Sequence, residues 1–483
     1  MTFNSWEFLI FYPIVAALYF LLPKKMKWPM LLIASYYFYA FYQAELLFLI
    51  ILTTVVSFFM SHLIERTEKT SLRKLYLSLT LIVCLGVLFF YKYFNFLGAS
   101  VSSIIELLGK EPPSIMLDLV LPVGISFYTF QTLSYVIDVY RGDIKTEKNI
   151  FFYALFVSFF PQLVAGPIER PSNLIPQLKE AHEPRLDNFI RGSKQMMLGF
   201  FKKICVADLV ASYVNAVYNS ADEATSLSVV IATLMFAVQI FCDFSGYTDI
   251  ATGCARIMGI RLMKNFDHPY SSTTIKEFWS RWHISLSGWF KDYLYIPLGG
   301  SRRSPLRNML NVFIVFLVSG LWHGANWTFV IWGALHGIYR VAGTLTIEKR
   351  NALIRRVGLT PESRSVVCVR RVFTFVLVSF AWVFFRANSI ADAFTLLGAL
   401  FTRHSSLSDV FAFMQLDTVS ILLVIFSVAT MILLDRAVSY SEDDGSDILV
   451  KGGSFIYYVF AVMLVWLLLL SKGQSSTFIY FQF

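Results

Sequence analysis

Charged residues are scarce in this chain of 483 residues, since Asp, Glu, Lys and Arg together make up 15% of it. Soluble domains carry about 25% charged residues and about 45–50% apolar ones. Here 56% of the residues are hydrophobic, and the mean hydropathy is +0.61. The shortage of charge excludes an ordinary soluble protein and indicates a polytopic membrane protein embedded in a lipid bilayer.

Cysteine is also scarce, with five residues in the whole chain and no CxxC spacing among them. An odd number without paired spacing indicates neither a disulfide framework nor a zinc site. Glycine-rich phosphate loops and nucleic-acid motifs are missing too. We therefore expect no bound metal and no nucleic-acid partner, although the net charge is +9.

The N-terminus lacks the features of a removable signal peptide. No basic residue precedes the first apolar run, Phe8–Leu22, and no small-residue cleavage site follows it. We expect a retained first crossing. Internal repeats are not apparent either, which counts against the repeat-built transporter folds.

Apolar runs, by contrast, recur along the whole chain. A full helical crossing needs about 20 apolar residues, and several runs are shorter, so some are expected to be tilted or re-entrant. The sequence predicts an all-α polytopic membrane protein, a helical bundle around a central cavity or tunnel with re-entrant or amphipathic helices at the cytoplasmic face. The runs are Phe8–Leu22, Pro29–Phe41, Leu46–Met60, Leu77–Phe90, Leu119–Val139, Ile150–Ala165, Met196–Tyr218, Leu227–Phe244, Met309–Leu321, Trp327–Tyr339, Val372–Phe385, Ile421–Leu434 and Phe455–Leu470.

Basic residues gather in the loops Leu22–Pro29, His62–Lys74 and Arg340–Arg371. The positive-inside rule places such loops in the cytoplasm, so both ends of the chain are expected outside. The stretches Gly166–Gln195 and Asp249–Leu306 are too polar to cross. We expect both to form helices and loops near the cytoplasmic face, and Pro161, Pro167 and Pro171 to interrupt helices.

The segment Phe278–Gly337 holds three of the seven histidines and six of the ten tryptophans. Histidine can take and give a proton near neutral pH. His323 lies between two apolar runs, and an ionisable residue at membrane depth suggests a functional site. Alternatively, His283 and His323 are interior or interface histidines beside tryptophan anchors. His336 is expected to be structural, because one straight helix would place it about 20 Å from His323.

Three motifs in this segment carry a family resemblance. They are Trp-His-Ile-Ser-Leu-Ser at Trp282–Ser287, Tyr-Ile-Pro-Leu-Gly-Gly at Tyr295–Gly300 and Leu-Trp-His-Gly at Leu321–Gly324. The chain resembles the membrane-bound O-acyltransferase (MBOAT) family, in particular bacterial proteins that O-acetylate alginate, other exopolysaccharides or peptidoglycan. It is also similar to the membrane protein of teichoic-acid D-alanylation. Further matches are Ala34–Tyr39, Leu121–Tyr128, Tyr135–Gly142, Ala165–Arg170 and Asp243–Asp249.

The resemblance implies an O-acyltransferase, most simply an acetyltransferase, in the plasma (inner) membrane of a bacterium. His323 occupies the position of the family's catalytic histidine and is expected to deprotonate an attacking hydroxyl. His283 is expected to bind the thioester donor or to stabilise charge on the carbonyl oxygen, unless it only holds the cytoplasmic helices together. The implied donor is acetyl-coenzyme A (acetyl-CoA) or an acyl carrier protein, with no cofactor bound.

The implied acceptor is an extracytoplasmic polysaccharide, and the implied partner is a serine-esterase-like protein outside the membrane. The resemblance covers most of the chain, so we expect one membrane domain over residues 1–483. Its catalytic core is expected over about 120–340, its C-terminal helices over 372–470 and an extracytoplasmic aromatic tail over 471–483.

That tail ends Phe-Ile-Tyr-Phe-Gln-Phe, which is more aromatic than a disordered terminus should be. Its Phe-x-Tyr-x-x-Phe pattern resembles the C-terminal motif of the small partner protein in teichoic-acid D-alanylation. The resemblance implies that the tail enters the outer mouth of the cavity and that Tyr480 carries the acyl group. The alternative is an interfacial aromatic belt.

Other interpretations stay open. The polar residues Asp243, Ser245, Tyr247 and Asp249 end an apolar run and could line the donor's entry or cap the helix. For the whole protein, one alternative is a proton-coupled transporter that uses its membrane histidines. Another is an acyltransferase with a lipid or protein acceptor.

Overall fold

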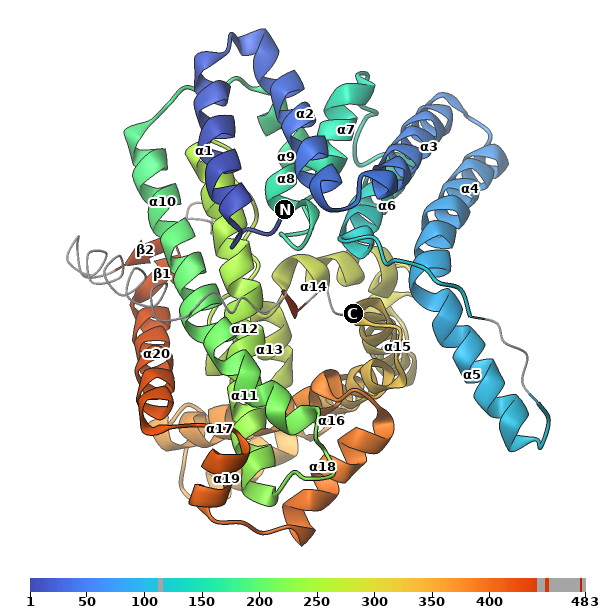
Figure 1. The fold of residues 1–483 in the computed structure, drawn as a ribbon. Coiled ribbons are helices and arrows are strands. Elements are labelled where there is room, and N and C mark those ends of the chain that lie inside the picture. Colours follow the sequence, from blue (N-terminus) through green and yellow to red (C-terminus); the bar gives the residue numbers. More distant parts are fainter. Residues whose placement is uncertain (112–115, 441–447, 451–477, 480–483) are drawn as a thin grey trace. The chain divides into compact units, whose positions relative to one another are not determined.

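The computed structural model describes residues 1–111, 116–440, 448–450 and 478–479 (Figure 1). Helices make up most of the described chain, which confirms the predicted all-α fold of a polytopic membrane protein. Strands β1 (Val438–Tyr440) and β2 (Ile448–Val450) form a short antiparallel pair. The last predicted run, Phe455–Leu470, lies outside the described residues.

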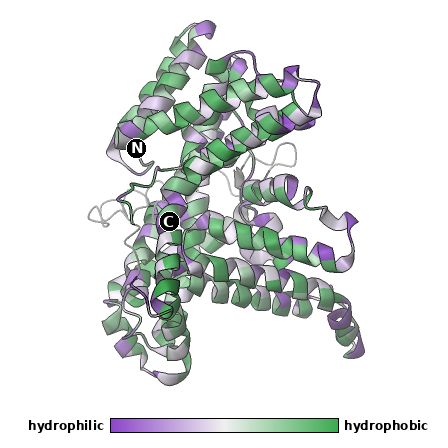
Figure 2. Cartoon of the chain, turned by 90° about the vertical axis from the view of Figure 1, so that its right-hand side faces the viewer, coloured by the Kyte–Doolittle hydropathy of each residue, from purple (hydrophilic) through white to green (hydrophobic). Residues whose placement is uncertain are grey.

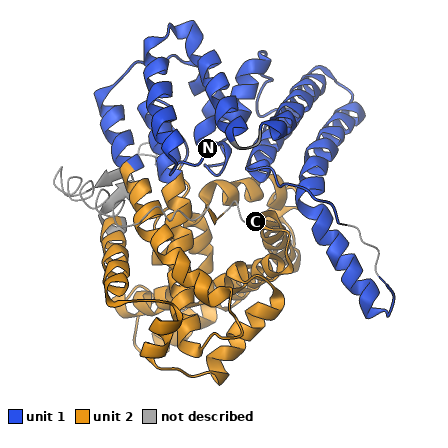
Figure 3. Ribbon diagram, in the orientation of Figure 1, with its two compact units in different colours: residues 1–196, 248–263 blue, residues 197–247, 264–483 orange. Residues whose placement is uncertain are grey.

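The chain divides into two compact units, which Figure 3 colours separately. Unit 1 comprises Met1–Met196 and Thr248–Met263, and unit 2 comprises Met197–Tyr247 and Lys264–Phe483. A compact unit need not fold by itself, so the expectation of one membrane domain with a central cavity stays a prediction.

Unit 1 is built mainly from N-terminal helices, in which α3 packs on α4 and α6 while α2 packs on α1 and α7. Pro161 lies in the first turn of α8 and Pro171 begins α9, where a missing N–H costs no helical hydrogen bond. The elements are α1 (Trp6–Leu21), α2 (Lys24–Gln43), η1 (Ala44–Leu46), α3 (Leu47–Arg66), α4 (Thr70–Leu88), η2 (Phe89–Tyr93), α5 (Phe94–Leu107), α6 (Ile125–Arg141), α7 (Ile150–Ser158), α8 (Phe160–Leu163), α9 (Pro171–Lys179) and most of α10 (Leu186–Phe200).

Unit 2 holds most of the long helix α12, a set of short helices and the helical hairpin of α15 and α16. Its elements are η3 (Phe201–Ala207), α11 (Asp208–Tyr218), α12 (Ser226–Ile257), η4 (Pro269–Ser271), α13 (Ile275–Arg281), α14 (Ile284–Phe290), η5 (Lys291–Tyr295), η6 (Gly300–Arg302), α15 (Pro305–His323), α16 (Trp327–Arg356), α17 (Arg364–Arg386), α18 (Ile390–Thr402), α19 (Leu407–Phe413), α20 (Thr418–Ala437) and the two strands.

Five helices of the described chain are long and apolar enough to cross a membrane, and α19 with α20 forms a sixth candidate that bends by 92°. Figure 2 shows hydrophobic residues along most helices and hydrophilic ones toward their ends. The five candidates are Ala44–Arg66, Thr70–Leu107, Ser226–Ile257, Pro305–His323 and Arg364–Arg386. Neither 166–195 nor 269–304 contains a candidate span, which agrees with the expectation that these polar stretches do not cross.

One of the two interpretations of the polar residues that follow the apolar run Leu227–Phe244 is wrong. Asp243 and Asp249 do not end a helix, because α12 continues to Ile257 and hides both side chains from solvent. The cap interpretation is therefore excluded. The run Met196–Tyr218 is helical throughout, and within it the π-helix η3 joins α10 to α11. Such widened turns often occur at functional sites.

Glycines bring α15 and α16 into close contact. A methyl group added to Gly320 would collide with the carbonyl oxygen of Phe329, and one added to Gly333 would collide with that of Phe316. Small residues at such crossings let two helix backbones approach closely within a membrane. This close contact keeps α15 and α16 together next to the turn at Gly324.

We expect Gly333→Ala to destabilise unit 2, because the added methyl group must push α15 and α16 apart. Overpacking of this kind costs about 1–3 kcal/mol. Gly343→Ala is the matched control, since it lies on the same helix with nothing within 4 Å of the added methyl group. Thermal unfolding in detergent should show a lower Tm for Gly333→Ala only. Equal Tm values would contradict the contact.

Candidate active site

His283 lies at the junction of α13 and α14, where its backbone is left-handed, with φ 46° and ψ 54°. Residues other than glycine seldom adopt this conformation, although asparagine, aspartate and histidine do so more often than the rest, and His268 does so here too. They persist in it where surrounding contacts impose the geometry, and such positions cluster at functional sites. The surroundings of His283 therefore fix its backbone.

Asn265 fixes the ring of His283. The Oδ1 atom of Asn265 accepts hydrogen bonds from Ser285 N at 3.2 Å and from Ser285 Oγ at 2.8 Å, and lies 3.1 Å from His283 Nδ1. A backbone N–H can only donate, so the amide atom that faces it must be oxygen. His283 Nδ1 must then carry the proton and donate it, which leaves the ring's lone pair on Nε2.

Burial sets the charge of this imidazole. Desolvation lowers the pKa of His283 to about 3, so the ring is neutral at neutral pH. A neutral ring of this tautomer offers an acceptor at Nε2. Stabilising charge on a carbonyl oxygen would instead require a second proton, which burial disfavours. Of the two expected active roles for His283, binding of the donor fits this geometry better.

His323 is the last residue of α15, and aromatic rings surround its imidazole. The ring centroids of Trp322 and Trp332 both lie 5.0 Å from that of His323, and the centroid of Phe385 lies 5.4 Å away. The centroid of His283 lies 6.4 Å away. The structure thus brings together the two histidines that the sequence singles out.

His336 lies closer to His323 than a straight helix would allow. The chain reverses after Gly324, and Trp332 lies between the two histidines, with ring centroids 5.0 Å from His323 and 4.9 Å from His336. The expected long separation is wrong because the helix breaks. Trp279 Nε1 donates to His336 Nδ1 at 3.2 Å, and this buried bond supports the structural role predicted for His336.

Asp243 belongs to a buried cluster of charges. Lys203, from the π-helix η3, lies with its Nζ 2.7 Å from Asp243 Oδ1 and 2.8 Å from Asp208 Oδ1. Burial alone would lower the pKa of Lys203, but the two carboxylates outweigh it and raise that pKa. The lysine therefore stays charged, as a buried ion pair of this geometry requires.

The other oxygen of Asp243 holds the C-terminal tail, since Asp243 Oδ2 accepts from Ile479 N at 2.7 Å. Phe478 and Ile479 are each 3% exposed. Phe478 packs on Tyr247, with ring centroids 4.7 Å apart, and on Phe244 at 6.2 Å. The belt interpretation is wrong for these two residues, because they are buried inside unit 2. Tyr480 lies outside the described residues.

Phe244 connects the tail to the histidines, because its ring centroid lies 4.6 Å from that of His283 and 6.2 Å from that of Phe478. The residues that sequence reasoning missed are Asn265, Lys203 and Asp208. A lysine inside the apolar run Met196–Tyr218 was a usable signal, since a buried charge demands a partner. Asn265 lies 18 residues before His283 and gave no such signal.

The low pKa of His283 makes a prediction about acid stability. The unfolded ring takes up a proton near pH 6.5 and the folded one only near pH 3, so the unfolded state binds more protons between these values. The free energy of unfolding should therefore fall by about 2 kcal/mol from this site as the pH drops from 7.5 to 5.

Asn265→Asp should remove this loss, because the new carboxyl and His283 together hold one proton whichever group carries it. The variant's Tm in detergent should then fall less than that of the wild type between pH 7.5 and pH 5. Ser285→Ala is the control, since it removes one donor to Asn265 and adds no charge. The same acid sensitivity in all three proteins would contradict the assigned contact.

Comparison with known proteins agrees with this architecture. Residues 31–389 match the profile of MBOAT, the membrane-bound O-acyltransferase family. The chain is 40% identical over 404 residues to "Probable alginate O-acetylase AlgI" of Pseudomonas aeruginosa, covering 83% of this chain and 75% of that one. It is 34% identical over 433 residues to the peptidoglycan O-acetyltransferase of Helicobacter pylori, covering 82% and 79%.

A more distant similarity links the chain to the teichoic acid D-alanyltransferase of Bacillus subtilis, with 28% identity over 313 residues, 60% of this chain and 78% of that one. The family match spans well over half of the sequence, and two of these relatives exceed 30% identity across most of both chains. The chain is a multi-pass membrane protein and an O-acyltransferase, and it belongs to the membrane-bound O-acyltransferase family.

Proposed function

We propose that this enzyme moves an acetyl group from a cytoplasmic thioester to an extracytoplasmic polysaccharide, such as an alginate-like exopolysaccharide or peptidoglycan. The relatives that match it over most of their length are named for acetylation of these polymers. The donor is acetyl-CoA or an acyl carrier protein. The enzyme lies in the bacterial inner membrane with its C-terminus outside, and a serine-esterase-like partner outside completes delivery.

In the first step, His323 takes the phenol proton of Tyr480 while the phenolic oxygen attacks the thioester carbonyl. A C–O bond forms, the C–S bond breaks, and the departing thiolate receives the proton from His323. His283, kept neutral by burial and oriented by Asn265, accepts a hydrogen bond from the donor at Nε2. A positioned general base of this kind contributes about 10²–10⁴-fold to the rate.

In the second step, a hydroxyl of the acceptor attacks the tyrosyl ester, directly or through the partner protein, and Tyr480 recovers its proton. The order of leaving groups suits this relay. A thiol has a pKa of about 8.5 and a phenol one of about 10. A sugar hydroxyl is a weaker acid than either, so transfer runs downhill from thioester to tyrosyl ester to sugar ester.

The observation that carries the proposal is the burial of Phe478 and Ile479. These residues contact α12 through Asp243, Tyr247 and Phe244, and Phe244 also contacts His283. Tyr480 is the next residue of the chain. Neither a proton-coupled transporter nor an enzyme with a lipid or protein acceptor requires this arrangement.

Tyr480→Phe should abolish transfer to polysaccharide, because it removes one oxygen and keeps the aromatic ring. Incubation of the wild type with donor alone should give one acetyl adduct on the C-terminal peptide, detected by mass spectrometry. His323→Ala should keep the hydroxyl and lose the adduct, since the phenol keeps its proton. Full polysaccharide acetylation by Tyr480→Phe would exclude the relay.

The hold of Asp243 on the tail can be tested apart from chemistry. Asp243→Asn keeps an acceptor for Ile479 N but loses the negative charge and the pair with Lys203. A charge-assisted hydrogen bond is worth about twice a neutral one. We expect carboxypeptidase to trim the folded variant past Ile479 about tenfold faster than the wild type. Ser245→Ala, a buried polar change on the same helix, is the control. Equal trimming of all three would exclude the contact.

A further inference from the structure

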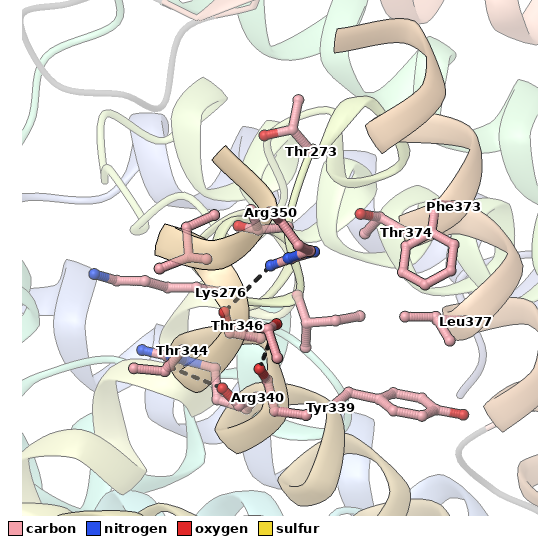
Figure 4. Close-up of a pocket in the computed structure, with 15 residues that line it drawn as sticks. Thr273, Lys276, Tyr339, Arg340, Thr344, Thr346, Arg350, Phe373, Thr374 and Leu377 are labelled. Atoms are coloured by element: carbon pink, nitrogen blue, oxygen red, sulfur yellow. Dashed lines mark hydrogen bonds between the residues drawn. The ribbon is translucent and has the colours of Figure 1, made fainter. Parts of the chain in front are cut away.

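A second feature of unit 2 lies apart from the histidines. It is a cavity of about 530 Å³ lined by the start of α13, one face of α16 and the middle of α17 (Figure 4). On α16 its lining residues include Arg340, Gly343, Thr344, Ile347 and Arg350. Their spacing of three or four residues follows the helical repeat, so one stripe of α16 forms a wall.

Three cations line this cavity: Lys276 from α13, and Arg340 and Arg350 from α16. Both arginines form hydrogen bonds within their own helix. Arg340 Nη1 donates to Thr344 Oγ1, and Arg350 Nη2 donates to Gly343 O at 3.2 Å. Figure 4 shows all three side chains around the cavity, with the charged ends of Lys276 and Arg340 toward one side and that of Arg350 nearer the middle of the view. Within the described part of the chain, no carboxylate forms an ion pair with any of them.

Glu277, a carboxylate that directly follows the lining residue Lys276 in the sequence, is already engaged. Glu277 accepts hydrogen bonds from Thr273 and pairs with Arg281, whose Nη2 lies 2.9 Å from Glu277 Oε1. These contacts hold the pKa of Glu277 below its ordinary value, although partial burial opposes them. The residues that line the cavity therefore include no acidic side chain to balance its positive charge. In addition, the Nε of Arg350 is buried without a hydrogen-bond partner among the described residues.

The opposite wall is apolar. Phe373 and Leu377 of α17 line the cavity together with Ile275 and Ile347. Phe373 is 54% exposed, so the cavity reaches the surface beside it. The same side of α17 also exposes Val369, Val372, Val376 and Phe380. Because α17 is a candidate membrane span, this exposed apolar face is where lipid chains would lie.

We propose that this cavity binds an anionic phospholipid, with its phosphate head group on Arg340, Arg350 and Lys276 and an acyl chain along Phe373 and Leu377. Guanidinium groups suit phosphate because their fork of N–H donors matches two oxygens at once. Basic pockets between membrane helices are a recognised place for anionic head groups. A phosphate on the thioester donor shares this chemistry, but the apolar opening at Phe373 favours a lipid.

A bound lipid would also restrain a helix next to the candidate active site. Lys276 belongs to α13, which ends two residues before His283, and Trp279 of the same helix bonds to His336. A ligand that fixes Lys276 therefore restrains the helix that positions His283.

The test is native mass spectrometry and thermal unfolding of the full-length protein in detergent. Phosphatidylglycerol, phosphatidylcholine or coenzyme A is titrated into separate samples. Phosphatidylglycerol should bind and raise the Tm, while neutral phosphatidylcholine should not. Loss of two basic residues should weaken binding about 30-fold, at roughly fivefold for each. We expect this for the Arg340→Gln/Arg350→Gln double variant.

Arg355→Gln/Arg356→Gln is the matched control, because it removes the same charge from exposed positions of the same helix outside the cavity. It should bind phosphatidylglycerol like the wild type. If the Arg340→Gln/Arg350→Gln variant does not fold, Lys276→Gln tests the site instead, because it changes an exposed side chain. It should weaken phosphatidylglycerol binding roughly fivefold. Equal weakening in both double variants would overturn the proposal. So would equal binding of phosphatidylcholine, or displacement of the lipid by coenzyme A, which would assign the cavity to the donor.

Discussion

The close approach of α15 and α16 at Gly320 and Gly333 is the constraint on which the site depends. With the two backbones in contact, the turn after Gly324 must be tight, and His323 is held at its edge. The same approach sets Trp332 against His323 on one side and His336 on the other. The two glycines take no part in the chemistry. They are required because only residues without a side chain let the two helices approach this closely, and that approach positions His323.

Polar groups buried in a membrane protein must find partners inside the protein, and this requirement arranges the rest of the site. Asn265 satisfies two donors of Ser285 and also the Nδ1–H of His283. Asp243 similarly uses one oxygen for Lys203 and the other for the tail. In both cases one side chain ties distant stretches of sequence together.

Much of the fold class and the identity of the two histidines could be predicted from the sequence, because apolar runs and local motifs are written in neighbouring residues. Helix ends were predicted less well. The carboxylates of α12 looked like a terminus, since sequence alone does not show that Lys203 and Ile479 meet Asp243 inside the protein. The nearness of His336 was missed because it depends on a chain reversal at Gly324. Asn265 was missed because its role exists only through a three-dimensional contact.

The charge state of His283 bears on its role in the proposed mechanism. A base works best when its pKa lies near the operating pH, and a group with a pKa of about 3 is a poor proton acceptor. His283 is therefore better suited to a fixed hydrogen-bond acceptor than to a proton shuttle. Its left-handed backbone and its bond to Asn265 hold it in that one role. The proposed mechanism therefore assigns proton transfer to His323, which ends α15 with its ring centroid 6.4 Å from that of His283.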